Sequence, residues 1–109
     1  MSAFHIGALR HRIVLESPVR ATDGGGGAVV TWLVVAELWA SIEPTAGSEA
    51  VVADQVSGRI SHVITVRHRP DVVPAMRLRL GTRIFEILAV LDVDERRRLL
   101  RCRCREEML

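Results

Sequence analysis

Apolar and polar residues alternate with a period of two through most of this sequence, and the three-to-four-residue spacing of an amphipathic helix is hard to find. A period of two places successive side chains on opposite faces of a β-strand. The alternating runs are short and are separated by turn-forming residues. With 109 residues, the chain is therefore expected to form one all-β domain over residues 1–109, a small antiparallel barrel or sandwich of about six strands.

The alternation also sets the expected strands, which cover residues 9–17, 29–44, 60–69, 76–80, 84–91 and 98–105. Pro18 is expected to end the first strand. Four consecutive glycines at 24–27 predict a hairpin turn rather than a phosphate-binding loop, because no helix with a following Lys-Ser/Thr pair appears. Gly81 opens a short loop that suits a type II′ hairpin. The strand after it is apolar on both faces, as a central strand would be.

Residues 45–59 form the longest predicted connection. They break the alternation and are long for a loop in so small a domain, with room for one helical turn after Ser48. Long loops in compact domains are usually functional or disordered. This segment is therefore the first candidate for activity.

The last expected strand carries two motifs on opposite faces, with Cys102 and Cys104 on one side and Arg101, Arg103 and Arg105 on the other. The cysteines continue the apolar pattern. They are too close in an extended chain for an unstrained disulfide, and they lack the spacing that is usual for paired zinc ligands. We expect free, buried thiols, with no metal and no cofactor.

The arginine face of that strand has three possible roles. It could be a solvated surface with Arg–Glu pairs, a protein–protein interface, or a phosphate-binding patch shared with Arg77 and Arg79 on a neighbouring strand. The net charge of only +2 and the scarcity of aromatic residues argue against a dedicated nucleic-acid binder. A stand-alone nucleic-acid-binding barrel remains an alternative.

No catalytic pattern can be recognised, whether a Ser/His/Asp order, a paired-carboxylate motif or a nucleophile elbow. His62 lies between Ile60 and Ile64 on an apolar face, which is typical of a core histidine. An enzyme is therefore disfavoured, and a metal-dependent hydrolase is the most distant alternative. No uncharged stretch approaches the ~20 residues of a membrane span. The N-terminal residues lack the apolar centre of a secretory signal, so we expect no membrane association and an intracellular origin.

The order of several short motifs carries a family resemblance over residues 7–106. The motifs are LRHRI at 9–13, the glycine-rich turn, Trp32, LWASIEP at 38–44, GSE at 47–49, HVITVRHRP at 62–70, GTRIFEI at 81–87 and DVDERRRLL at 92–100. Together they resemble the phage head-tail joining family, the head-closure or stopper proteins of long-tailed double-stranded-DNA phages, prophages and gene transfer agents. No single motif is diagnostic, but their order and spacing together are fairly specific to this family.

The resemblance implies a β-barrel subunit, made in the bacterial cytoplasm, that forms a six- or twelve-fold ring in the neck of the particle. Its partners would be further copies of itself, the adaptor protein under the portal, and a tail-terminator or tail-tube protein. Double-stranded DNA would pass through the ring without sequence-specific binding. The nearest alternative within the same machine is a tail-terminator or tail-completion ring protein.

The resemblance also implies that the long loop reaches into the channel and helps to close it after packaging. Here the loop maps onto residues 45–59, with Thr45, Gly47, Ser48, Glu49, Asp54, Gln55, Gly58 and Arg59 as candidate channel residues. The family motifs do not fix the subunit contacts. As our own hypothesis, the candidate interface residues are Trp39, Glu43, Arg77, Arg79, Arg96, Arg101 and Arg103.

Overall fold

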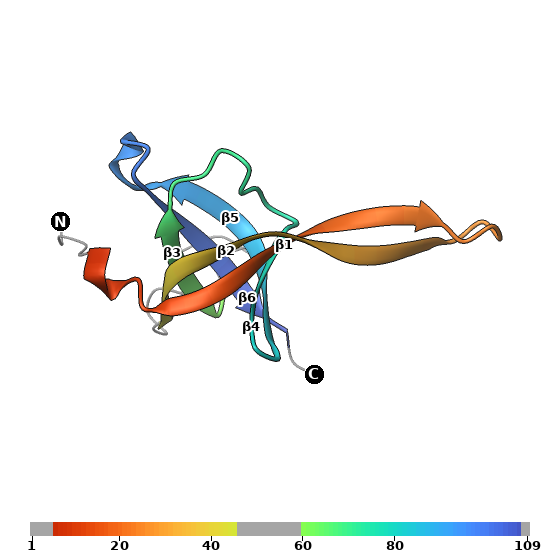
Figure 1. The fold of residues 1–109 in the computed structure, drawn as a ribbon, viewed down its shortest axis with the longest axis horizontal. Helices are drawn as coiled ribbons and strands as arrows, with labels where there is room; N and C mark the ends of the chain where they lie inside the picture. The colour runs from red at the N-terminus through yellow and green to blue at the C-terminus, as the bar shows by residue number, and fades with distance from the viewer. Residues whose placement is uncertain (1–5, 46–59, 108–109) are drawn as a thin grey trace.

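The computed structural model describes residues 6–45 and 60–107, which form six β-strands and two short 3₁₀ turns (Figure 1). The elements are η1 (Ile6–Ala8), β1 (His11–Thr22), β2 (Ala28–Pro44), β3 (His62–Arg67), β4 (Arg77–Leu80), β5 (Arg83–Asp92), η3 (Val93–Glu95) and β6 (Leu99–Glu106). The strands pair antiparallel in the order β1-β2-β3-β6-β5-β4, and β4 pairs back onto β1, so the sheet closes into a barrel. The predicted all-β class and six antiparallel strands are confirmed, whereas the expected helical turn after Ser48 lies outside the described residues. No helix within the described ranges is long and apolar enough to cross a membrane.

The inward faces of the strands form one apolar core. Its buried members are Ile13, Leu15, Ala40, Ile64, Val66, Val72, Met76, Leu78, Phe85, Ile87, Leu100, Cys102 and Cys104. Both cysteines are free and fully buried, which confirms their assignment to the core. Burial raises the pKa of the Cys102 thiol to about 12, so this group stays protonated and unreactive at neutral pH.

Two glycine turns connect strands as the sequence predicts. After β1, the Asp23 carboxylate accepts hydrogen bonds from the backbone N–H groups of Gly25 and Gly27, at 2.8 and 3.1 Å. Between β4 and β5, Leu80 pairs with Arg83 around a two-residue loop in which Gly81 has a φ of +61°. A positive φ at the first loop position only is the type II′ geometry.

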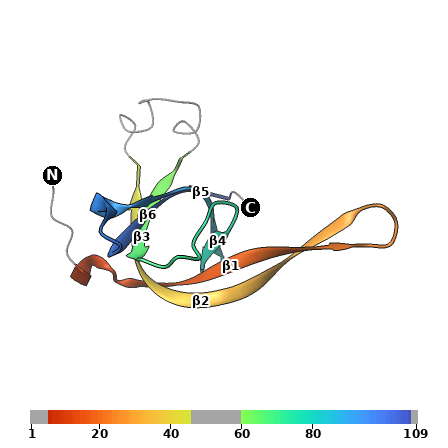
Figure 2. The same cartoon turned by 90° about the horizontal axis from the view of Figure 1, so that it is seen from above.

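The first two strands extend well beyond the barrel (Figures 1 and 2). β4 pairs with β1 only over residues 14–16, and β3 pairs with β2 only over residues 40–44. Residues 17–33 therefore form a two-stranded ribbon, which we call the arm, and no other described strand pairs with it. The arm accounts for the elongated shape, 52 × 29 × 26 Å along the principal axes.

The prediction that Pro18 ends the first strand is wrong, since β1 continues to Thr22. Pro18 lies opposite Trp32 in the arm, where β1 has β2 as its only described neighbour. A proline has no N–H to donate, and an edge strand tolerates this because no second strand requires that donor.

Candidate subunit interface

Charged residues of alternating sign follow one another across four strands of the barrel's outer surface. The register sets Glu16 of β1 opposite Arg77 of β4, Arg77 opposite Glu86 of β5, and Glu86 opposite Arg105 of β6. Two of these pairs form short ion pairs, with 2.6 Å between Arg77 Nε and Glu16 Oε1 and 2.6 Å between Arg105 Nη2 and Glu86 Oε1. This part of the surface is therefore neutralised within the chain.

Glu16 is the best enclosed of these charges, with only 4% of the residue exposed although it is on the outer face. Its two carboxylate oxygens accept hydrogen bonds from Arg77 Nε and, at 3.1 Å, from Arg79 Nε. The Arg77 guanidinium also stacks on Trp32, 4.1 Å from the ring centroid. Burial alone would raise the pKa of Glu16, but the hydrogen bonds and charges of both arginines outweigh it and lower the pKa below 4.5.

The structure contradicts the third of the alternatives considered for these arginines, a single basic patch uniting those of β4 and β6. β5 lies between these strands, so they are not neighbours. Arg77 and Arg79 are held by Glu16, and Arg105 is held by Glu86. For these three arginines, the solvated face with Arg–Glu pairs is the interpretation that the structure supports.

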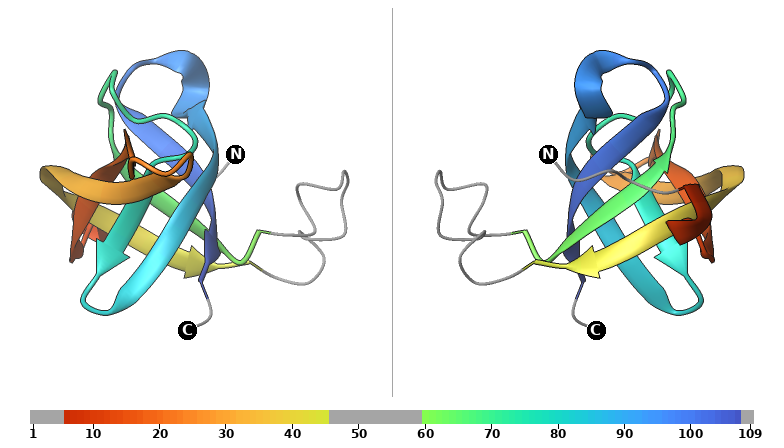
Figure 3. Two further views of the ribbon diagram at one scale, coloured as in Figure 1. Left: turned by 90° about the vertical axis from the view of Figure 1, so that its right-hand side faces the viewer. Right: turned by 90° about the vertical axis from the view of Figure 1, so that its left-hand side faces the viewer.

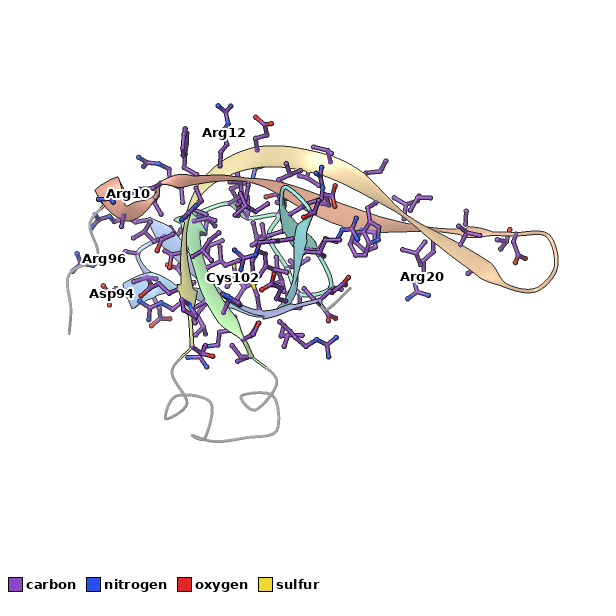
Figure 4. The ribbon with its side chains drawn as sticks, turned by 90° about the horizontal axis from the view of Figure 1, so that it is seen from below. Arg10, Arg12, Arg20, Asp94, Arg96 and Cys102 are labelled. Atoms are coloured by element: carbon purple, nitrogen blue, oxygen red, sulfur yellow. The ribbon has the colours of Figure 1, made fainter. Side chains whose placement is uncertain are left out.

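Trp39 is exposed on the outer surface of β2, with 51% of its area accessible. It lies opposite Arg12 of β1, whose guanidinium is 5.5 Å from the indole centroid and 2.9 Å from Glu37 Oε1. Figure 4 shows Arg12 directed away from the barrel, with Cys102 inside it. An exposed tryptophan beside an arginine has the chemistry that energetically dominant interface residues usually have.

The other candidate interface residues lie elsewhere on the same outer surface. Arg101 and Arg103 point outward from β6, and Arg101 is exposed. Arg96 is exposed just after η3, near the end of the molecule that also carries Arg10 (Figure 4). Glu43 is exposed near the end of β2. Among the residues that the structure describes, no carboxylate lies within ion-pair distance of Arg96, Arg101 or Arg103.

The long segment predicted as the channel loop starts and ends at one edge of the barrel. Thr45, directly after β2, donates its backbone N–H to Ser61 O at 3.0 Å and its hydroxyl to Ile60 O at 3.1 Å. Figure 3 shows the end of β2 and the start of β3 meeting there. Of the candidate channel residues only Thr45 is described, and Gly47, Ser48, Glu49, Asp54, Gln55, Gly58 and Arg59 lie outside the described residues.

His62 lies beside this edge, with its side chain 15% exposed, so it is largely but not completely buried. Its ring packs edge-on against Phe85 at 5.1 Å, and its Nδ1 is 2.9 Å from Ser61 Oγ. Burial lowers the pKa of His62, against the raising effect of Glu106 and with the help of the Arg83 charge. Glu106 is itself engaged by Arg83, at 2.8 and 3.1 Å. His62 is thus a neutral, packed histidine at neutral pH.

None of these groups forms a recognisable reactive set. Within residues 6–45 and 60–107, no group of three His, Cys, Asp or Glu side chains is placed to bind a metal ion. What the geometry offers instead is a closed barrel with one projecting arm and with the residues on either side of segment 46–59 hydrogen-bonded to each other at one edge. Sequence reasoning missed the arm, although the unusual length of the 29–44 run was a usable signal.

Comparison with known proteins gives a consistent result. A family model described as phage head completion protein matches residues 4–107. A chain in the virion of a native gene transfer agent particle is similar in structure, with a TM-score of 0.69 and 34% identity, covering 91% of this chain and 94% of that one. Protein SF1141 from Shigella flexneri 2a, solved in solution, has a TM-score of 0.73 and 28% identity, covering 94% and 96% of the two chains. No curated protein matches the sequence.

Proposed function

Because the chain belongs to the phage head completion protein family, we propose that it is a connector subunit that forms a ring between the portal–adaptor complex and the tail of a phage-like particle. The ring continues the DNA channel and helps to retain packaged DNA. The family is one of structural proteins, and the similar gene transfer agent chain is part of a particle. At this level, the protein is a structural component of a phage-like particle.

The observation that carries the proposal is the base of segment 46–59. Thr45 bonds to both Ile60 and Ser61, so the ends of a 14-residue segment are fixed side by side on a rigid barrel edge. A segment held in this way can change its arrangement without disturbing the barrel, which is what opening and closing a channel requires. We propose that this segment closes the channel, through residues Thr45, Gly47, Ser48, Glu49, Asp54, Gln55, Gly58 and Arg59.

The charges of the barrel suit a channel through which DNA slides. Six arginines pair with five carboxylates of the same chain, which reduces the positive charge available to phosphates. Every phosphate that a protein neutralises adds salt-dependent affinity, and such affinity would hold the DNA in place. A stand-alone nucleic-acid-binding barrel would instead bind DNA at ~150 mM salt with a steep salt dependence.

We propose that the neighbours of the chain are other copies of itself, the adaptor protein and a tail-terminator or tail-tube protein. Trp39, Glu43, Arg96, Arg101 and Arg103 are exposed or half-buried on the outer surface and are available for such contacts. Arg77 and Arg79 would contribute mainly by holding Glu16, since both are already bonded to it.

The closure is tested by replacing residues 46–59 with a short turn of about four residues, which the adjacent ends of β2 and β3 permit. In the native particle, we expect normal ring assembly but a loss of DNA-filled heads, counted by electron microscopy. As a control, the Gly81–Thr82 turn is replaced with Asn-Gly and should leave filled heads unchanged. Normal DNA retention without segment 46–59 would contradict the closure, and imaging of the chain outside the neck would contradict the ring.

A further inference from the structure

The backbone of β2 has an unpaired edge along the arm. In an antiparallel pair of strands, residue pairs that exchange backbone hydrogen bonds alternate with pairs whose N–H and C=O groups point away from the partner strand. Asp23 donates its N–H to Gly27 O at 3.2 Å, so the hydrogen-bonded pairs are every second pair from there along the register. Pro18 and Trp32 then form one of the pairs that point outward, which fits a proline because it has no N–H to donate to β2.

On β2 the outward positions include Val30, Trp32 and Val34. Each directs its N–H and C=O groups away from β1, and no described backbone group elsewhere in the chain hydrogen-bonds to them. Val30 and Val34 are 40% and 61% exposed, and Figure 2 shows the arm projecting away from the barrel. We call residues 28–36 the open edge of β2.

The two edges of the arm differ in how well they are protected. On β1, the outward positions include Pro18, which interrupts the row of donors, and Arg20, which Figure 4 shows directed away from the ribbon. Proline and charged residues on an edge are devices by which soluble proteins keep other strands from pairing with it. The open edge of β2 has neither, because residues 28–36 contain no proline and no charged residue. β2 therefore has the edge that can accept another strand.

We infer that the open edge of β2 binds an extended, uncharged segment of a second polypeptide chain, which adds to the arm as a third strand. The inference goes beyond the proposed ring and does not depend on it. Its basis is the backbone, because N–H and C=O groups that recur at every second residue of a strand are matched by another extended backbone.

Other kinds of partner do not satisfy these groups. A helix has its backbone groups bonded internally, and a purely apolar surface has no donors or acceptors, so either partner would leave the N–H and C=O groups of Val30, Trp32 and Val34 buried without hydrogen bonds. A charged side chain on the added strand would find no opposite charge beside it on residues 28–36. The partner segment is therefore expected to be extended and uncharged over about five or six residues, the usual length of a strand.

A third strand would also stabilise the arm. A two-stranded ribbon is marginally stable in water, and three strands are needed for independent stability. The arm is fixed near the barrel by Trp32, which stacks on Arg77 at 4.1 Å from the ring centroid. From Trp32 to the glycine turn at 24–27, no described strand other than β1 pairs with β2.

The first test removes one donor from the open edge. Val30→Pro deletes an N–H that points away from β1, so the free chain should keep its circular dichroism spectrum, as the native Pro18 on the opposite edge indicates. In native particles, this variant should lower the number of tail-bearing particles severalfold. Val30→Ala, which keeps the N–H, and Thr22→Pro, at an outward position of β1, are the matched controls and should assemble normally. Normal assembly of Val30→Pro, or an equal loss with Thr22→Pro, would overturn the inference.

Amide hydrogen exchange gives a second readout that needs no variant. In the free chain, the outward amides of Val30, Trp32 and Val34 should exchange rapidly, because they have no described acceptor. In native particles, their exchange should be slower by about tenfold or more, as it is for amides in a paired strand. The amides of Arg20 and Thr22, on the β1 edge, should show no such change. Equal exchange rates at Val30, Trp32 and Val34 in the free chain and in the particle would mean that no strand is added there.

Discussion

Replacing Glu16 with glutamine tests how much the enclosed ion pair contributes to the barrel. The glutamine keeps the shape of the side chain but removes the negative charge that faces Arg77 and Arg79. The Glu16 side chain is 6% exposed, and those of its partners are 17% and 36% exposed. Removal of the carboxylate therefore leaves one largely buried cation and one partly solvated cation without a counter-charge.

The size of the effect follows from these two environments. A hydrogen bond to a charged group contributes about 1.5–3 kcal/mol, and the Arg77 bond is buried enough for that range. The Arg79 bond is discounted to below about 1 kcal/mol, because its guanidinium is more than a third exposed. The total loss is about 2–3 kcal/mol, which lowers the melting temperature of a domain of this size by about 10 °C.

Thermal unfolding followed by circular dichroism at pH 7 measures this loss. Glu37→Gln is the matched control, because Glu37 is 55% exposed and pairs with Arg12 at 2.9 Å on the surface. The control should cost less than about 1 kcal/mol. If Glu16→Gln is no more destabilising than Glu37→Gln, the argument from burial is refuted.

The stabilisation that Glu16 provides relative to glutamine should depend on pH and decrease in acid. The arginines hold the pKa of Glu16 below its usual value of 4.5, so the stabilisation is fully present above pH 4.5 and is lost as the pH falls through the lower folded-state value. The difference in melting temperature between wild type and Glu16→Gln should therefore narrow below pH 4.5. A difference that persists unchanged at about pH 3 would mean that the carboxylate charge is not its cause.

Three further outcomes are expected. Cys102 and Cys104 should resist a thiol reagent at pH 8 in the folded protein and react on unfolding, because burial raises the pKa of both; labelling at the unfolded rate in native buffer would contradict their burial. His62 should titrate below 6.5 by NMR, and stability should fall as the pH drops below 6.5, since the unfolded state takes up that proton first. A midpoint above 6.5 would instead mean that Glu106 outweighs burial. Trp39→Ala should leave the melting temperature nearly unchanged, as the residue is half exposed, yet weaken ring assembly measured by native mass spectrometry; unaltered assembly would remove Trp39 from the interface.

Strand positions and the core could be predicted from the sequence because both depend on local alternation. Ile13 and Leu15 are two positions apart, as are Cys102 and Cys104, so the alternation alone places each pair on one face of its strand. The turns at 24–27 and at Gly81 could also be predicted from local sequence, since glycine readily adopts the positive φ found in both turns.

The neighbours of each strand could not be predicted in the same way. Alternation specifies which face a side chain occupies but not which strand lies next to it, so the separation of β4 from β6 by β5 went unforeseen. The burial of Glu16 could not be predicted for the same reason, because its partner Arg77 is 61 positions away in the sequence. Only the closed barrel brings the two together.

The arm shows why a run of apolar residues has more than one structural meaning. Val29, Val30 and the residues at 33–35 are apolar on both faces, which inside a sheet indicates burial on both sides. Here the same pattern lies where β3 and β4 no longer pair with β2 and β1, so these side chains are exposed among the residues that the structure describes. The same apolar pattern that marks a buried strand inside a sheet therefore marks an exposed ribbon here, and only the pairing of the neighbouring strands distinguishes the two.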